Sequence, residues 1–148
     1  MRLVLQRVTR AEVRVGGVPV ATGDRGLLVL VGVGIDDDPA EAGRLAEKVA
    51  HLRVFEDEDG KMNLAIGDVG GEVVVVPQFT LYGDASRGRR PSWAKAAPPE
   101  VAAERVAAFA GALEGLGITV HRGAFKEHME VELVNDGPVT LMLEGGRG

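Results

Sequence analysis

The sequence predicts a single α+β domain, residues 1–148, in which mostly antiparallel strands pack with two main helices and can close into a barrel. Three observations support this fold class. A chain of 148 residues has the length of one domain. Several short runs rich in Val and Leu lie between Gly and Pro residues, as strands do. Two other stretches carry apolar residues at steps of three and four, the spacing of a helix with one buried face.

The first strands are expected before residue 32. Residues 3–15 are predicted to form one strand with alternating side chains near its end. Gly16-Gly17 then forms a two-residue hairpin turn, because both glycines can adopt positive φ, and residues 18–20 begin the returning strand. Residues 27–31 are apolar throughout, which favours a strand that is covered on both faces.

The first helix is expected directly after these strands. Asp38 is predicted to cap it, Pro39 to occupy its first position and Glu41 to complete a capping box. The apolar stripe that should face the core consists of Ala42, Leu45, Ala46 and Val49.

The second half of the chain repeats the alternation of strand and helix. The Val run at residues 73–76 predicts a buried strand that Pro77 ends. Residues 82–97 show no clear period and are predicted to form a long ordered loop. Pro98-Pro99 opens the second helix. The stripe of this helix consists of Ala102, Val106, Phe109, Leu113 and Leu116, and the last strands are expected at residues 118–120, 130–134 and 139–143.

The composition limits the class of protein. The chain contains no Cys, which excludes disulfides, thiolate metal sites and a Cys nucleophile and fits a reducing cytoplasm. No apolar run approaches the ~20 residues that a membrane span needs, and the N-terminus lacks the apolar core of a signal peptide. A soluble, cytoplasmic protein without a membrane contact is therefore expected.

The charge of the chain bears on nucleic-acid binding. The net charge of −5 argues against a general nucleic-acid coat protein, because non-specific affinity comes from neutralised phosphates. One concentrated basic patch nevertheless stands out, and it is either an ordinary solvated loop or a local contact with nucleic acid. Its members are Arg87, Arg89, Arg90 and Lys95.

Common catalytic and metal-binding patterns are missing from the sequence. His51, His121 and His128 show no metal-ligand spacing. The acidic run at residues 56–60 is either a solvated turn or a Ca²⁺ site, although it lacks the spacing of an EF-hand. There is no nucleophile elbow, P-loop or dinucleotide-binding motif. We therefore expect no metal and no cofactor, and an enzyme of this sequence would rely on backbone groups, a hydroxyl and its substrate.

Two polar segments beside apolar strands are the candidate sites. In Gln78-Phe79-Thr80 the N–H groups of Phe79 and Thr80 could face an oxyanion, and the alternative is a plain strand end with Phe79 in the core. Asn135-Asp136-Gly137-Pro138 is a rigid connection between two apolar strands, and the alternative is an ordinary hairpin. Only about 5–6% of X-Pro bonds are cis, so the sequence alone predicts a trans Gly137-Pro138 bond.

Further segments have the order and spacing of one known family. They are Leu5-Gln6-Arg7-Val8 with Ala11 and Val13, Leu52-Arg53-Val54-Phe55, Gly60-Lys61-Met62-Asn63, Gly88-Arg89-Arg90-Pro91-Ser92, Ala96-Ala97-Pro98, Met129, and Val134 to Thr140. Together with the two candidate sites, they make the chain resemble the D-aminoacyl-tRNA deacylases, the D-tyrosyl-tRNA deacylase family, from end to end.

The resemblance implies a fold and a reaction. The family is a homodimeric, barrel-like α+β domain that hydrolyses the ester at the 3′ end of D-aminoacyl-tRNA, releasing free D-amino acid and tRNA without a metal. The resemblance implies that the N–H groups of Phe79 and Thr80 stabilise the oxyanion and that Gln78 orders the pocket wall. In the family Thr80 has also been viewed as a nucleophile, but without an adjacent base its hydroxyl would be weak, so we expect a positioning role instead. The 2′-hydroxyl of the tRNA itself is implied to help activate water.

The resemblance also implies a gate that selects by chirality. The Gly137-Pro138 bond would be cis, would be braced by Arg7 and would reach the active site of the partner subunit. Its carbonyls would accept a D-residue and reject an L-residue through a clash with backbone. Glycine has no side chain to reject, so mischarged glycyl-tRNA would also be a substrate. Met129 would support the pocket wall.

The chain departs from the family at two places, and three alternatives stay open. Pro77 stands where the family usually has Ser, and Lys126-Glu127-His128 stands where it commonly has Gly-Ala, which changes the wall near Met129. The first alternative is a non-hydrolytic tRNA- or DNA-binding module of the same fold. The second is an enzyme that removes wrong L-amino acids, as the editing domain of some threonyl-tRNA synthetases does. The third is a purely structural homodimer.

Overall fold

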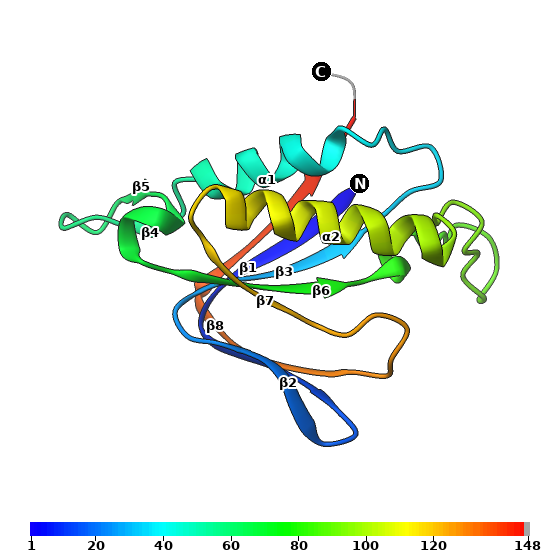
Figure 1. Ribbon diagram of the computed structural model, residues 1–148, viewed down its shortest axis with the longest axis horizontal. Helices are drawn as coiled ribbons and strands as arrows, with labels where there is room; N and C mark the ends of the chain where they lie inside the picture. The colour runs from blue at the N-terminus through cyan, green and yellow to red at the C-terminus, as the bar shows by residue number, and fades with distance from the viewer. Residues whose placement is uncertain (147–148) are drawn as a thin grey trace.

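The computed structural model describes residues 1–146 and shows a curved six-stranded sheet with two helices packed on one of its faces, and a separate two-stranded sheet (Figure 1). No helix among these residues is long and apolar enough to cross a membrane. The elements in chain order are β1 (Arg2–Val15), β2 (Val18–Gly23), β3 (Gly26–Gly32), α1 (Glu41–His51), β4 (Phe55–Glu56), β5 (Met62–Leu64), the 3-10 helix η1 (Ile66–Val69), β6 (Glu72–Pro77), the 3-10 helix η2 (Phe79–Tyr82), α2 (Pro99–Gly115), β7 (Thr119–Arg122) and β8 (Glu130–Glu144).

The sheet is mixed and nearly closes on itself. Its strand order is β2-β1-β3-β6-β7, with β8 paired to β1. β1 runs antiparallel to β2, β3 and β8, as expected. The pairs β3–β6 and β6–β7 are parallel, which the expectation of mostly antiparallel strands did not include. The connections within these two pairs contain α1 and α2, the kind of crossover that parallel neighbours need.

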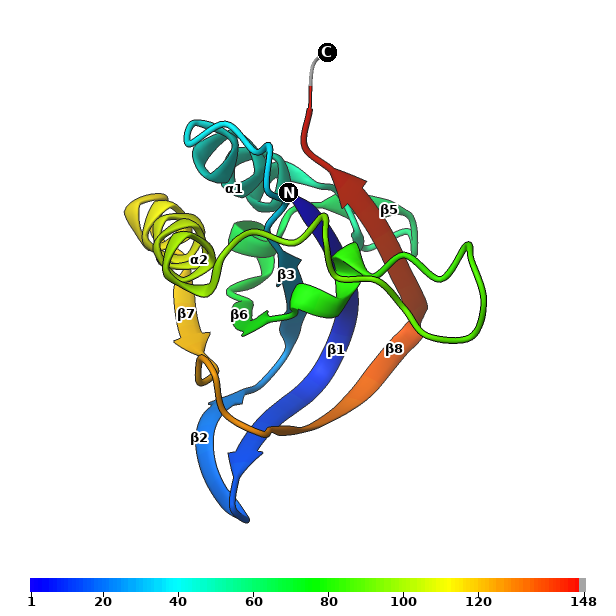
Figure 2. The same cartoon turned by 90° about the vertical axis from the view of Figure 1, so that its right-hand side faces the viewer.

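Two apolar cores lie on the two faces of the sheet. The larger core lies between the sheet and the two helices, which share one face of it (Figure 2). It includes Leu5 of β1, Val75 of β6 and Phe109 of α2. The smaller core lies on the other face, with Val13, Leu28 and Val74 among its members. β3 and β6 face both cores, which explains why their sequences are apolar throughout.

The helix α1 begins later than the sequence predicts. Its first residue is Glu41 and its N-cap is Ala40, which makes no side-chain capping bond. Asp38 does accept a bond from the Ala40 N–H at 2.8 Å, but in the turn before the helix. Glu41 does not complete a capping box. It is buried, and its carboxylate lies 3.0 Å from the amino group of Met1. The predicted stripe of this helix is correct, because Ala42, Leu45, Ala46 and Val49 are all buried.

The end of α2 and the course of β8 also differ from the predictions. Leu116 was expected in the stripe of α2, but the helix ends at Gly115 and Leu116 is exposed. The strands predicted at residues 130–134 and 139–143 belong to one strand, β8, both halves of which pair with β1. The segment from Asn135 to Pro138 is therefore not a hairpin but an interruption within a strand.

Candidate active site

A cavity with a volume of about 850 Å³ opens beside the end of β6. This volume is within the range of small-ligand sites, about 300–1,000 Å³. Part of its lining comes from Val31 of β3, Val33 directly after β3, and Val76 of β6. The loop before α2, the start of α2 and the loop between β7 and β8 complete it. Its remaining lining residues are Ile35, Pro77, Gln78, Phe79, Trp93, Ala96, Ala97, Pro98, Pro99, Ala102, Val106, Ala124, Phe125, Lys126, Glu127, His128, Met129 and Val131.

Two backbone N–H groups at the edge of this cavity have no acceptor in the described part of the protein. The last ladder bond at the end of β6 runs from the Gln78 N–H to the Val31 carbonyl, at 2.8 Å. The next internal bonds begin with the N–H of Leu81, which donates to Gln78. The N–H groups of Phe79 and Thr80 lie between these two donors, at the start of η2. The change from strand to 3-10 helix thus leaves two consecutive donors free to bind a ligand oxygen.

Two contacts orient the side chains around these donors. The Gln78 amide nitrogen donates to the Thr80 hydroxyl, which fixes the orientation of both groups. Phe79 is exposed rather than in the core, and its ring meets Trp93 edge to face at a centroid distance of 5.2 Å. An isolated strand end, with Phe79 packed into the core, is therefore not what the structure shows.

Three contacts hold η2 against the sheet. The Arg2 guanidinium donates to the Leu81 carbonyl at 3.0 Å and stacks over the Tyr82 ring at 4.5 Å. The Tyr82 ring packs on Gly34, where an added Cβ would come within 2.7 Å of the ring. Burial, the largest influence, raises the pKa of the Tyr82 hydroxyl to about 12. The free N–H groups are thus carried by a short helix that is fixed to β1 and to the chain after β3.

The second candidate segment is a bulge in β8. On β1, Gln6 pairs with Thr140 and Val8 pairs with Asn135, so a single β1 residue, Arg7, stands opposite residues 136–139. The Gly137-Pro138 bond in this bulge is cis. Both residues are exposed.

Arg7 holds the bulge from inside the protein. It is only 4% exposed, and its guanidinium donates to the Val54 carbonyl at 2.8 Å and to the Asp136 carbonyl at 3.1 Å. Its Nε also lies 3.3 Å from a carboxylate oxygen of Asp136. The Asn135 amide donates to the carbonyls of Arg7 and Val139 at 3.2 and 2.9 Å, which closes the base of the bulge.

The predicted site residues fall into two groups. Gln78, Phe79 and Met129 line the cavity, and Thr80 comes directly after Phe79 in η2. Arg7, Gly137 and Pro138 do not line the cavity of their own chain and instead form the separate bulge. Sequence reasoning missed Trp93 as a lining residue, and its position as the only Trp in a loop was the signal available.

The histidines take no part in a metal cluster within residues 1–146. His121 bonds to the Glu72 carboxylate at 3.0 Å. The pKa of Glu72 is lowered, first by a bond from the Asp24 N–H and then by His121. His51 is exposed at the end of α1, and His128 lies in the loop that lines the cavity.

Comparison with known proteins places the chain in a family. The family model described as D-Tyr-tRNA(Tyr) deacylase matches residues 4–144. The chain belongs to this family. A D-aminoacyl-tRNA deacylase of Heliobacterium modesticaldum is 56% identical over 148 residues, covering 100% of this chain and 99% of the relative. One from Anaeromyxobacter dehalogenans is 55% identical, covering 99% of each chain. These matches confirm the family predicted from sequence, whose named activity is that of a hydrolase.

Solved structures of this fold agree with the architecture. A structure named c-Myc DNA Unwinding Element Binding Protein superposes with a TM-score of 0.92 at 37% identity, covering 99% of this chain and 100% of that chain. A structure described as a probable eukaryotic D-amino acid tRNA deacylase has a TM-score of 0.82 at 17% identity, covering 96% and 97% of the two chains. The latter likeness concerns the fold alone.

The environment of Tyr82 gives a direct test of the packing that anchors η2. Tyr82 is the only tyrosine, so tyrosinate absorbance reports it alone. We expect the native protein to titrate near 12 and the denatured protein near about 10. Because the pKa of Tyr82 is raised in the folded state, folding favours its neutral hydroxyl. The stability that this hydroxyl contributes is full below about pH 10 and is lost as the pH rises toward 12. A native titration near the ordinary value would show that Tyr82 is not packed against Gly34 and Arg2.

Proposed function

We propose that this protein hydrolyses the ester bond of D-aminoacyl-tRNA, releasing the free D-amino acid and tRNA. The observation that carries the proposal is the pair of unoccupied N–H donors at Phe79 and Thr80, at the edge of a cavity of about 850 Å³. Family membership supplies the substrate class, since the matched relatives are named D-aminoacyl-tRNA deacylases. Ester hydrolysis is the reaction in which paired N–H donors of this kind act.

The proposed chemistry uses the backbone. Water attacks the ester carbonyl carbon, and the carbonyl oxygen becomes an oxyanion that accepts bonds from the Phe79 and Thr80 N–H groups. The bond from carbon to the terminal ribose oxygen then breaks, and that oxygen takes a proton. Two fixed donors stabilise the charge that develops, and removing one such donor typically costs about 10²–10³ in rate.

Among residues 1–146, no general base is aligned beside these donors. Glu127 and His128 line the cavity, but neither bonds to the other, to Gln78 or to Thr80 in the described structure. A base that activates a nucleophile is normally held by such bonds. We therefore propose that the 2′-hydroxyl of the terminal ribose assists the attacking water, and that the Thr80 hydroxyl, held by Gln78, positions the substrate.

Selection of the D-residue is proposed to come from the Gly137-Pro138 bulge of a second copy of the chain. The bulge is exposed and lies outside the cavity of its own chain, whereas Arg7 and Asn135 hold it in a fixed shape. When the bulge is inserted into a partner's cavity, its backbone would lie close to the α-carbon of the bound amino acid. On that side there would be room for the hydrogen atom of a D-residue but not for the side chain of an L-residue. A built-in clash rejects every L-residue without recognising each side chain. Glycine would pass, so mischarged glycyl-tRNA is included among the proposed substrates.

A homodimer would also protect β8. This strand is 15 residues long, and among residues 1–146 it pairs with β1 alone, which leaves its other edge open. Val134 and Met142 expose 47% and 76% of their surface on it. Long open edges with exposed apolar residues favour association with another chain. The proposed dimer would cover this strand and bring the bulge of each chain to the cavity of the other.

The main alternative is a tRNA- or DNA-binding module that does not hydrolyse its ligand. One similar structure is named for binding a DNA unwinding element, which keeps this alternative in view. The net charge of −5 and the unoccupied donors at Phe79 and Thr80 favour the hydrolase. An enzyme that removes L-amino acids is the other alternative, and the same experiment separates all three.

Hydrolysis of matched D-tyrosyl-tRNA and L-tyrosyl-tRNA, without added metal, tests the proposed reaction. We expect the D-ester to be cleaved at least about 100-fold faster, a difference of about 2.7 kcal/mol between the two transition states. Cleavage of neither ester would favour the binding module. Equal cleavage of both, or preference for the L-ester, would overturn the chirality gate.

The Thr80→Ala variant tests the positioning role of the hydroxyl. Loss of one hydrogen bond of about 0.5–1.5 kcal/mol should lower kcat/KM for the D-ester by about 3–10-fold, with little change in the melting temperature, because Thr80 is exposed. Thr80→Ser, which keeps the hydroxyl, is the matched control and should retain most activity. An unchanged rate in Thr80→Ala would show that the hydroxyl has no role.

The Gly137→Leu variant tests the gate. Gly137 has a φ of +129°, which L side chains rarely adopt, and an added Cβ would lie 2.9 Å from Val139 and 3.1 Å from the Arg7 guanidinium. The distorted bulge should lower kcat/KM for D-tyrosyl-tRNA by at least about tenfold, since a change of about 1.4 kcal/mol has that effect. The dimer, measured by sedimentation, should persist. Gly111→Ala, at an open position on α2, is the control. Full activity of Gly137→Leu would exclude this segment as the gate.

A further inference from the structure

The loop between η2 and α2 carries the basic patch, and it is closed at its base. The N–H groups of Asp84 and Ser92 each donate to the carbonyl of the other at 2.8 Å. The Asp84 carboxylate also accepts a bond from the Ser86 N–H at 2.9 Å. Bonds from Ser86 and the charge of Lys95 lower the pKa of Asp84, which keeps it ionised. The residues between 84 and 92 thus form the tip of a loop whose two ends are fixed together.

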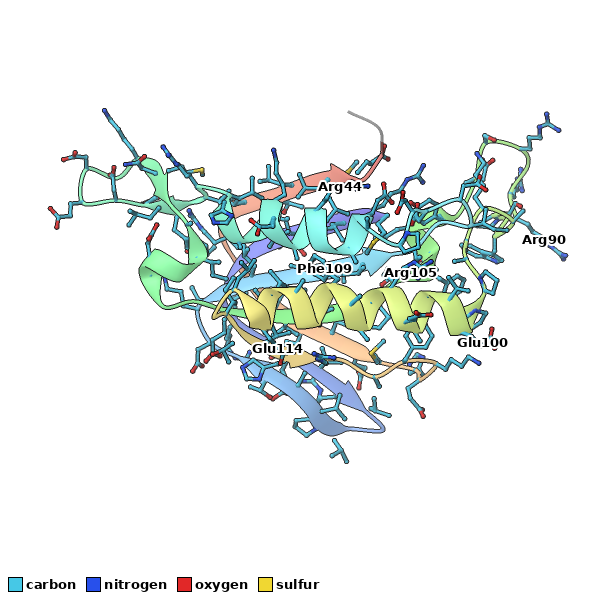
Figure 3. The ribbon with its side chains drawn as sticks, turned by 45° about the horizontal axis from the view of Figure 1, so that its top comes forward. Arg44, Arg90, Glu100, Arg105, Phe109 and Glu114 are labelled. Atoms are coloured by element: carbon cyan, nitrogen blue, oxygen red, sulfur yellow. The ribbon has the colours of Figure 1, made fainter. Side chains whose placement is uncertain are left out.

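Three arginines at this tip are free of ion pairs. Arg87, Arg89 and Arg90 are exposed, and none contacts a carboxylate among the described residues. Figure 3 shows Arg90 extending away from the body of the protein into solvent. Lys95 differs, because its amino group lies 3.7 Å from Asp84. A chain with a net charge of −5 therefore concentrates three unpaired cations on one short tip.

Trp93 follows the tip directly and is held in one orientation. Its ring packs on Gly83, where an added Cβ would come within 2.6 Å, and against the edge of Phe79 at a centroid distance of 5.2 Å. It remains 44% exposed while it lines the cavity. A fixed and half-exposed indole beside a cluster of cations is the combination that binds single-stranded nucleic acid, through base stacking and phosphate contacts.

The two features lie within reach of one another and of the cavity. Arg90 is three residues from Trp93, so their Cα atoms are at most about 11 Å apart. A chain that enters the cavity past Trp93 must therefore pass close to the basic tip. The terminal adenosine carries the ester, and the nucleotides before it are single-stranded RNA with one phosphate each.

We propose that this loop binds the single-stranded nucleotides that precede the terminal adenosine of the substrate, an inference that rests on the proposed function. A base stacks on the exposed part of Trp93, and Arg87, Arg89 and Arg90 contact the phosphates. The loop thereby makes the protein prefer a polynucleotide ester over the same ester on a single nucleoside. Because the chain has a net charge of −5, the rest of the protein repels phosphates, which limits RNA binding to this loop.

A charge-removal variant, Arg87→Gln/Arg89→Gln/Arg90→Gln, tests the phosphate contacts. With D-tyrosyl-tRNA we expect KM to rise at least tenfold while kcat changes little. The slope of log affinity against log salt should become shallower by about 2, since each contact with a single strand contributes about 0.7. With D-tyrosyl-adenosine, which has no upstream phosphate, the variant should match the wild type. Arg44→Gln/Lys48→Gln/Lys61→Gln removes the same charge from exposed positions on α1 and beside β5 and should leave both substrates unaffected.

Trp93 tests the stacking contact independently of catalysis. It is the only tryptophan, so the fluorescence of the protein reports on it alone. Binding of deacylated tRNA should quench this fluorescence, and the charge-removal variant should need at least tenfold more tRNA for the same quenching. Trp93→Ala should raise KM for D-tyrosyl-tRNA at least about fivefold, and Trp93→Phe, which keeps an aromatic face, should largely restore it.

The outcomes separate this inference from the proposed function. If the wild type cleaves neither D-tyrosyl-tRNA nor D-tyrosyl-adenosine, the proposed function itself is wrong. If the wild type cleaves both, and the charge-removal variant loses the same factor on both or nothing on either, the loop does not bind upstream nucleotides. Absence of tryptophan quenching by tRNA would likewise overturn the stacking contact.

Discussion

The antiparallel pairing of β1 with β8 is the constraint on which the proposed site depends. The two strands are in register at both ends, with Leu3 opposite Leu143 and Val13 opposite Val131. Extra residues of β8 between these pairs must therefore leave the ladder, and they do so opposite Arg7. Arg7 lies on the same face of β1 as Leu3 and Leu5, because alternate residues of a strand point to the same side. Its side chain therefore points toward the helix-covered core. A buried guanidinium is costly unless its donors are satisfied, so the bulge and the arginine stabilise one another.

In the proposed mechanism, the end of β6 supplies hydrogen-bond donors without a catalytic side chain. Its Val run is buried; all four residues pair with β3, and residues 73–75 also pair with β7. The register ends at Pro77, and the following 3-10 turn leaves the Phe79 and Thr80 N–H groups without internal acceptors. Pro77 itself has no N–H, so the position before Gln78 cannot contribute a donor. The geometry of the site thus follows from where the strand stops, and a Ser at that position is not needed for it.

Much of this architecture could be predicted from sequence, because it follows local periodicity. The stripe Ala42, Leu45, Ala46 and Val49 and the strand at residues 73–76 were correct for that reason. The start of α1 was wrong because Glu41 pairs with the Met1 amine, which is distant in sequence. The continuity of β8 was missed because its partner strand lies at the other end of the chain. Arg7 did carry a local signal. Leu3 and Leu5 are apolar, and Arg7 is the next residue on the same face of the strand, where a charge is unexpected. For Trp93 the available signal was only that it is the single tryptophan and lies in a loop, because no period relates a loop to a pocket.

The departure at Lys126 shows which properties of the pocket wall can change. Lys126 adopts a φ of +60°, in the left-handed region that favours glycine, at the position where the sequence resemblance leads us to expect Gly. The backbone therefore keeps the conformation that glycine permits, while the side chains of Lys126, Glu127 and His128 add charge and a titratable ring to the lining. In the proposed mechanism the oxyanion donors and the gate are backbone groups, which such changes leave in place. In that mechanism, side chains around the cavity can vary the affinity for the RNA, while the ester and its chirality are recognised by main-chain atoms, of which a substitution to proline would remove only an N–H.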